Sequence, residues 1–268
     1  MSALRLGARL ACAGALISLL ACAPAAALVP SSGYEQTDNW AGYQDTATGS
    51  FDQISGSWVQ PTNECTKAVP YSMLSPWLGI GDPGGAGRQG TRIEQIGSTE
   101  TCIWRHGKRT QIARGIWENW PSPSHSVRHP MEPGDRLSAA VLISGHELTM
   151  TLQDLTRHWK FVKRLTVAAP DERSAEWIVE ATGFSNIPGQ HSPLASFTPV
   201  TFTRAKAGDT SGQTGAIGSP DWEANRIAMI FSPPARLRAW PSALKAGGTS
   251  FTVTPADRVP PAEPPPPV

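Results

Sequence analysis

Two glutamates lie four residues apart in the stretch RSAEWIVEA, residues 173–181, among apolar side chains. A carboxyl group can take a proton from water and pass it to a leaving group, as general base and then general acid. The run of Trp, Ile and Val favours a β-strand, in which alternate side chains face opposite sides. One face would carry Ala175, Trp177 and Val179, and the other Glu176, Ile178 and Glu180. The alternation alone favours a simpler alternative, a half-buried strand with a solvated acidic face.

Two other patterns suggest ligand sites, but neither has the context that it needs. The glycines of GIGDPG, residues 79–84, have the spacing of a dinucleotide-binding loop, yet Pro83 and the residues after it do not begin a helix. His125 and His129 have the spacing of zinc ligands on a helix, but the prolines around them prevent a regular helix. We interpret residues 79–84 as a loop and expect neither a cofactor nor a metal.

The first 27 residues are typical of an export signal. Arg5 and Arg9 precede an apolar stretch too short to span a bilayer, and small residues suited to cleavage follow, near Ala25 or Ala27. Lipidation of Cys22 is a second interpretation of the same segment. We expect a secreted protein, extracellular or periplasmic, with no membrane segment in the mature form.

Removal of the signal would leave two cysteines, Cys65 and Cys102. In an oxidising compartment an isolated pair is most simply a disulfide. The alternative, a metal-binding pair, lacks further His or Cys residues at ligand spacing. We therefore predict that Cys65 and Cys102 form a disulfide.

The composition limits the kinds of binding partner that we expect. Charged residues make up 17% of the chain and the formal net charge is +1, so nothing favours binding to nucleic acid or to a membrane surface. Hydrophobic residues make up 40%, which is enough for a core. The ten Trp residues could fill that core or line a groove for an extended ligand.

Most of the chain predicts short strands, interrupted at short intervals by Gly and Pro. In DRLSAAVLISGHELTMTLQDL, residues 135–155, apolar residues alternate on both sides of SGHE and predict a hairpin. No long stretch has helical periodicity with caps. We expect a single all-β sandwich domain over residues 34–254, followed by a Pro-rich, disordered tail over residues 255–268.

Eight short motifs follow one another along the chain after the signal. They are NWAGY at 39–43, GSWVQP at 56–61, SPWLGIG at 75–81, IEQIGS at 93–98, WENWP at 117–121, PGD at 133–135, SAEWIVEA at 174–181 and SFTPVTFTRA at 196–205. Each is weak alone, but eight in this order are hard to produce by chance. Together they resemble the glutamic peptidase family, the eqolisins, and within it the bacterial secreted branch, which the placement of the two cysteines also resembles.

The resemblance implies a fold and a pair of catalytic residues. The fold is a concanavalin-like β-sandwich of two antiparallel sheets, whose concave face would bind the substrate. Glu176 matches the catalytic glutamate of the family, and Gln95 of EQIGS matches its partner. The carboxylate can take the proton of an attacking water and later pass it to the amide nitrogen, while the Gln amide donates to the oxyanion. Such catalysis uses no metal and forms no covalent intermediate.

The resemblance to the family says less about the other residues near the predicted site. Trp77 matches a family tryptophan at the substrate site, with core packing as the alternative, and Glu118 matches an acidic residue near the site, with an ordinary surface position as the alternative. Glu180 shares a face with Glu176 and would either raise its pKa by like charge or lie at a rim. Ile96 stands where the family has a small residue, which would narrow the site.

We therefore predict a secreted glutamic-type endopeptidase that is monomeric, acts on polypeptides and, as the resemblance implies, works at acid pH. The alternative from another class is a lectin-like carbohydrate-binding module on the same fold. A retaining glycosidase would instead have to place Glu176 about 5 Å from Glu180 or Glu118.

Overall fold

The structure is a computed structural model that describes residues 34–82, 92–167, 172–182, 193–231 and 236–258. The predicted signal, most of the predicted tail and residues 83–91 lie outside this range. Within it the chain is almost entirely β-strand, with one 3-10 helix at Ala256–Arg258. No helix among the described residues is long and apolar enough to cross a bilayer. The all-β prediction is confirmed.

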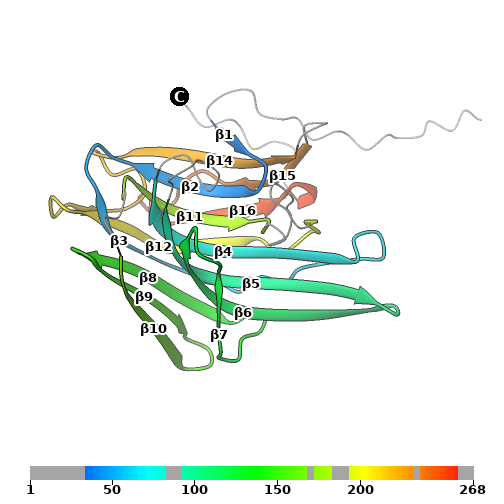
Figure 1. Cartoon of the computed structure of the whole chain (residues 1–268). Coiled ribbons are helices and arrows are strands. Elements are labelled where there is room, and N and C mark those ends of the chain that lie inside the picture. Colours follow the sequence, from blue (N-terminus) through cyan, green and yellow to red (C-terminus); the bar gives the residue numbers. More distant parts are fainter. Residues whose placement is uncertain (1–33, 83–91, 168–171, 183–192, 232–235, 259–268) are drawn as a thin grey trace, which may run out of the picture.

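The strands form two layers along one continuous hydrogen-bonded path (Figure 1). The first layer, the site sheet, contains in spatial order β14 (Glu223–Phe231), β2 (Trp40–Thr46), β11 (Ser174–Glu180), β4 (Tyr71–Gly81), β5 (Ile93–Arg105), β6 (Lys108–Trp120) and β7 (His125–Val127). The second layer contains β10 (Trp159–Thr166), β9 (Glu147–Asp154), β8 (Arg136–Ser144), β3 (Phe51–Val59) and β12 (Val200–Asp209). Neighbours along the path are antiparallel.

The two predicted sheets are joined at one side of the sandwich. There the path continues through β16 (Phe251–Pro255) and β15 (Arg236–Pro241). Strand β12 makes the junction because it changes partner: Val200–Phe202 pairs with β16, whereas Thr203 and the residues after it pair with β3. The register shifts after Thr203, and Arg204 has a φ of 54°. Two short strands lie off the path, β1 (Glu35–Thr37), which is parallel to β14, and β13 (Thr214–Gly215), which pairs with β12.

The main hydrophobic core lies between the layers, and Trp177 of β11 is one of its largest fully buried side chains. The indole Nε1 donates to the Ser55 carbonyl oxygen of β3 at 2.9 Å, which ties the two layers together. The ring fits there because β3 has Gly56 at the contact, where an added Cβ would lie 3.3 Å from the Trp177 ring. Large and small side chains thus interlock across the sandwich.

Several local predictions can be compared with the strands. The predicted hairpin is β8–β9, and its turn contains Gly145 with a φ of 60°. The loop interpretation of GIGDPG is wrong for its first three residues, Gly79–Gly81, which end strand β4. Strand β16 ends at Pro255 and the 3-10 helix follows, so the first four residues of the predicted tail belong to the folded domain.

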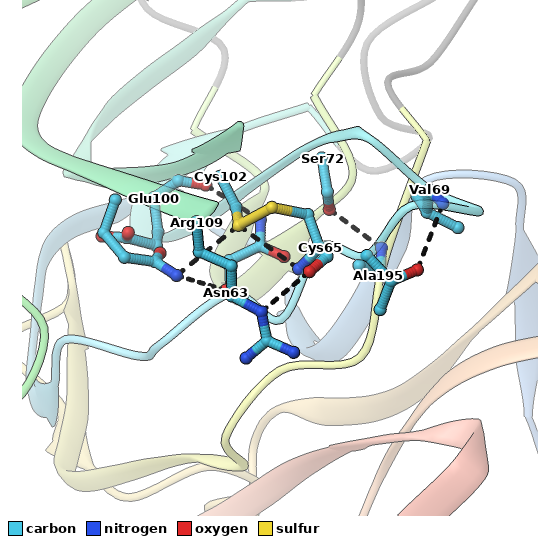
Figure 2. The surroundings of a disulfide bond; sticks show 10 residues. Asn63, Cys65, Val69, Ser72, Glu100, Cys102, Arg109 and Ala195 are labelled. Atoms are coloured by element: carbon cyan, nitrogen blue, oxygen red, sulfur yellow. Dashed lines mark hydrogen bonds between the residues drawn. A yellow bond between two sulfur atoms is a disulfide. The ribbon is translucent and has the colours of Figure 1, made fainter. Parts of the chain in front are cut away.

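The predicted disulfide joins Cys65 to Cys102 with their Cα atoms 5.7 Å apart (Figure 2). It links the segment before β4 to strand β5, and both cysteines are fully buried. The Arg109 side chain of β6 donates to the Cys65 carbonyl oxygen at 2.9 Å. The bond therefore anchors the segment that leads into β4 against the β5–β6 hairpin.

Candidate active site

Strand β11 lies in the middle of the site sheet, hydrogen-bonded to β2 on one side and β4 on the other. Its alternation is as predicted. Ala175, Trp177 and Val179 face the core between the layers, and all three are fully buried. The opposite face of the site sheet, which we call the carboxylate face, carries Glu176 and Glu180.

The predicted solvated acidic face is wrong, because Glu176 is 0% exposed. Neighbouring strands place large apolar side chains on the same face as Ile178. They form a second hydrophobic cluster of Trp40, Trp77, Ile93, Ile178 and Ile227, with the partly buried Trp120 packed against it. The glutamate is consequently withdrawn from water, an environment that disfavours its charged form.

Six strands contribute one residue each to a row across the carboxylate face. The register aligns, strand by strand, Asn225 with Gln44, Gln44 with Glu176, Glu176 with Gly79, Gly79 with Gln95, and Gln95 with Glu118. Residues aligned in this way project from the same face of a sheet. The structure therefore brings the three predicted residues Glu176, Gln95 and Glu118 into one row.

Gly79 separates Glu176 from Gln95 in this row. Their Cα atoms lie two strand spacings apart, roughly 10 Å. A Cβ atom at Gly79 would lie 3.0 Å from both the Gln95 Cβ and the Glu94 carbonyl oxygen, closer than most such contacts. No side chain therefore stands between Glu176 and Gln95 in the row.

The two carboxyl oxygens of Glu176 have different surroundings. Oε1 accepts hydrogen bonds from Gln44 Nε2 at 2.7 Å and from Ser174 Oγ at 2.9 Å. Oε2 is buried and accepts none from the described residues. Burial raises the pKa of Glu176 to about 7, a rise that Gln44 and Ser174 oppose and the charges of Glu35 and Asp82 increase.

Gln95 of β5 is held by its neighbour in the row. Its Nε2 donates to Glu118 Oε2 at 3.0 Å, and burial raises the Glu118 pKa to about 7. Glu118 is thus not an ordinary surface residue, because it orients the amide of Gln95. An amide nitrogen carries two N–H donors, so one remains for another partner.

Trp77 and Glu180 form a separate pair on the carboxylate face. The Trp77 ring is fully buried, packs edge-on against Trp40, and donates from Nε1 to Glu180 Oε2 at 2.9 Å. This geometry fits the packing alternative, and contact between Trp77 and substrate stays a prediction. Glu180 also accepts from Asn39 at 3.2 Å, and its pKa is raised to about 7 by burial. The neighbouring charges that raise the Glu176 pKa most are those of Glu35 and Asp82.

The structure places Ile96, at which the sequence departs from the family pattern, and also Asp82, which follows strand β4. Ile96 faces the core between the layers, where it is fully buried, so the prediction that it narrows the site is wrong. It alternates with Gln95 on β5 and must point the opposite way. Asp82 accepts a hydrogen bond from the exposed Arg173 at 2.7 Å, which joins the end of β4 to the start of β11.

Three further residues belong to the site and were not predicted from the sequence: Gln44, Ser174 and Gly79. Gln44 follows Trp40 and Gly42 at alternate positions, which is a weak signal that it shares their face. Nothing in the sequence indicates that β2 pairs with β11 or that β11 pairs with β4. Those pairings bring Gln44 and Gly79 to Glu176, whereas Ser174 lies on β11 itself, two residues before it.

A cavity of about 320 Å³ lies elsewhere, lined in part by Glu64, Leu194, Arg238 and Asp257. It adjoins the segment of the disulfide, and none of the row residues lines it. A cavity of this size could hold a small ligand. The carboxylate face is the stronger candidate because it gathers carboxyl and amide groups that can exchange protons and donate to an oxyanion.

Comparison with known proteins identifies the family and relates the fold to solved structures. Residues 38–228 match the model of the Peptidase A4 family. Scytalido-glutamic peptidase, solved with a peptide-based transition state analog, superposes with a TM-score of 0.64 at 21% identity, covering 81% of this chain and 98% of that one. SCP-B, a member of the eqolisin family solved with the tripeptide Ala-Ile-His, gives 0.63 at 21% identity over 81% and 98%. Aspergilloglutamic peptidase from Aspergillus niger gives 0.52 at 23% identity over 69% and 99%. No curated protein matches the chain.

The fold and the matched family define a class, that of the all-β glutamic peptidases. The chain belongs to the Peptidase A4 family, the eqolisins, and it is a glutamic-type endopeptidase. This confirms the resemblance and favours the peptidase hypothesis over the lectin-like alternative. The roles of individual residues are not tested by these comparisons and are proposed below.

Proposed function

We propose that the protein is a secreted, monomeric endopeptidase that cleaves polypeptides at acid pH, with Glu176 and Gln95 activating a water molecule. One observation carries the proposal: Glu176 and Gln95 face the same side of one sheet, in one row, with only Gly79 between them. A proton-exchanging group and an oxyanion donor must flank a reacting carbonyl in this way. Secretion is supported by the predicted signal, and by a disulfide of the kind that oxidising compartments maintain.

The first step is attack of water on the scissile carbonyl carbon. Ionised Glu176 takes one proton from the water as its oxygen bonds to carbon. The carbonyl oxygen becomes an oxyanion, to which the free N–H of Gln95 donates. Loss of one such donor typically lowers turnover by about 10²–10³-fold.

The second step breaks the C–N bond. Glu176 passes the proton to the amide nitrogen, the electron pair of the bond leaves with the amine, and the oxyanion collapses to a carboxylic acid. Glu176 is ionised again at the end of the cycle. No bond forms between protein and substrate, and the glutamine does not titrate, so its donor is present at every pH.

The acid preference is supported by the resemblance to the glutamic peptidase family, and the carboxyl groups of the row influence how activity changes with pH. Glu118, Glu176 and Glu180 all have pKa values raised to about 7, and the charge of Glu118 further raises that of Glu180. Groups that interact lose their protons in successive steps. Glu176 must be ionised to begin the cycle, so its raised pKa keeps the active fraction small at acid pH. Ionisation of Glu118 places a negative charge beside the oxyanion donor Gln95, so activity should decline as the pH rises further.

Incubation of the purified mature protein with denatured casein, at a series of acid pH values, tests this function. We expect cleavage that EDTA, serine reagents and thiol reagents leave unchanged. Loss of activity with EDTA that zinc restores would contradict the mechanism. Absence of casein cleavage at every pH, by protein with a cooperative thermal unfolding transition, would contradict the function itself.

A further inference from the structure

The asymmetry of the Glu176 carboxyl has a consequence for the reaction. Oε1 is held by Gln44 Nε2 at 2.7 Å and by Ser174 Oγ at 2.9 Å. Both donors are themselves buried, with Gln44 4% and Ser174 0% exposed. Buried donors with short bonds to one oxygen fix the rotation of the carboxyl group.

Neither donor belongs to the strands that carry Gly79 and Gln95. Gln44 projects from β2, on one side of β11, whereas Gly79 and Gln95 belong to β4 and β5 on the other side. Ser174 lies on β11 itself, two residues before Glu176. Oε2 is buried and accepts no hydrogen bond from the residues that the structure describes. A buried carboxyl oxygen without a partner is costly, so its polar capacity is available to a ligand.

We infer that Gln44 and Ser174 are positioning residues that hold Oε1 of Glu176, so that Oε2 is the oxygen that exchanges the proton with water and with the leaving amine. The inference rests on the proposed function and adds two residues to it. It divides the carboxyl into an anchored oxygen and a reactive oxygen. Both donors favour the ionised form of Glu176, which is the form that begins the cycle.

Other charged groups act on the same carboxyl and must stay unchanged in the test. Glu35 of β1 and Asp82 at the end of β4 oppose its ionisation, and Glu118 and Glu180 lie on the same face of the sheet. Neither Gln44 nor Ser174 carries a charge. Their removal therefore alters hydrogen bonding to Glu176 without altering the charge around it.

The test measures kcat/KM for a chromogenic peptide cut by the protein, as a function of pH, in Gln44→Met, Ser174→Ala and the double variant. Loss of a donor to the ionised form raises the pKa of Glu176, so the acid limb of the profile should move to higher pH. We expect a shift of about one pH unit for each single variant and a larger shift for the double variant. Thr201→Val is the control, because it removes an exposed Thr201–Thr252 hydrogen bond between β12 and β16, outside the row. The acid limb of the kcat/KM profile of this variant should stay at the wild-type pH.

Structural and positioning roles give different results. A lower melting temperature with an unmoved acid limb in Ser174→Ala, the smaller change, would show a purely structural role and overturn the inference. An unchanged profile in the double variant would also overturn it. Failure of the proposed function would give a different result. Glu176→Gln would then retain activity, regardless of how substitutions of Gln44 and Ser174 change the pH profile.

Discussion

Glu176 and Gln95 project from the same face of the site sheet, two strands apart, and Gly79 of the intervening strand is aligned with both. The arrangement places a carboxyl and an amide on opposite sides of a position that lacks a side chain. Gln44 extends the row beyond Glu176, and Glu118 extends it beyond Gln95. The row therefore supplies each proposed catalytic group with a hydrogen-bonding neighbour on its outer side.

Gly79→Ala should damage catalysis more than folding. The new methyl would lie 3.0 Å from the Gln95 Cβ, so it should displace the side chain that we propose as the oxyanion donor. We expect kcat/KM to fall by about 10- to 100-fold, because displacements of about 1 Å have effects of this size. Gly49→Ala is the matched control, since a Cβ there meets nothing within 4 Å. Equal activity of both variants would contradict this expectation.

Glu118 should have two effects on catalysis. It should influence turnover because it holds the Gln95 amide, and it should influence the pH profile because it is ionisable. Glu118→Gln keeps an oxygen that can accept from Gln95 but removes an ionisable group whose pKa is raised to about 7. We expect near-normal activity at acid pH and a loss of activity that begins at higher pH than in the wild type. Glu118→Ala removes the acceptor, so its kcat should fall by about tenfold at every pH. Identical pH profiles of the wild type and Glu118→Gln would contradict this account.

Stability should also decline as the pH rises, because of a carboxyl on the other face of the sheet. Glu94 is fully buried, neither of its oxygens accepts a hydrogen bond from the described residues, and burial raises its pKa to about 7. In the unfolded chain the pKa returns to about 4.3, so the folded state binds more protons between these values. The stabilisation is therefore complete below about pH 4 and is lost as the pH rises to about 7.

Urea unfolding at pH 4 and pH 7 measures this contribution. Glu94→Gln should reduce the difference between the two unfolding free energies by up to about 3 kcal/mol. Glu223→Gln changes an exposed glutamate and should leave the difference as it is. If both variants keep the wild-type difference, Glu94 does not contribute to the pH dependence of stability.

The sequence predicted local structure well because alternation is a local signal. It placed Trp177 and Glu176 on opposite faces of β11, and it located the β8–β9 hairpin from its turn. It did not predict how deeply Glu176 is buried. That depends on Trp40 and Trp77, which come from strands more than ninety residues earlier in the chain.

The candidate site was predictable only in part. The resemblance of short motifs indicated Glu176, Gln95 and Glu118, and the structure places them in one row. Gln44 and Gly79 lie in the same row but could not be found from sequence, because their roles depend on which strands pair and in which register. A register shift of one residue would turn each of these side chains to the opposite face.

The central claim is tested most directly by the kcat/KM for casein cleavage, at the optimum pH, of Glu176→Gln beside Glu180→Gln. Both glutamates are on β11, face the same side and have pKa values raised to about 7, although Glu176 is fully buried and Glu180 is partly exposed. We predict that Glu176→Gln, which cannot exchange a proton, loses activity by about 10³-fold or more with its melting temperature retained. Glu180→Gln, which alters a carboxyl held by Trp77 and Asn39, should stay within about tenfold of the wild type. Near-wild-type cleavage by a folded Glu176→Gln would contradict the account.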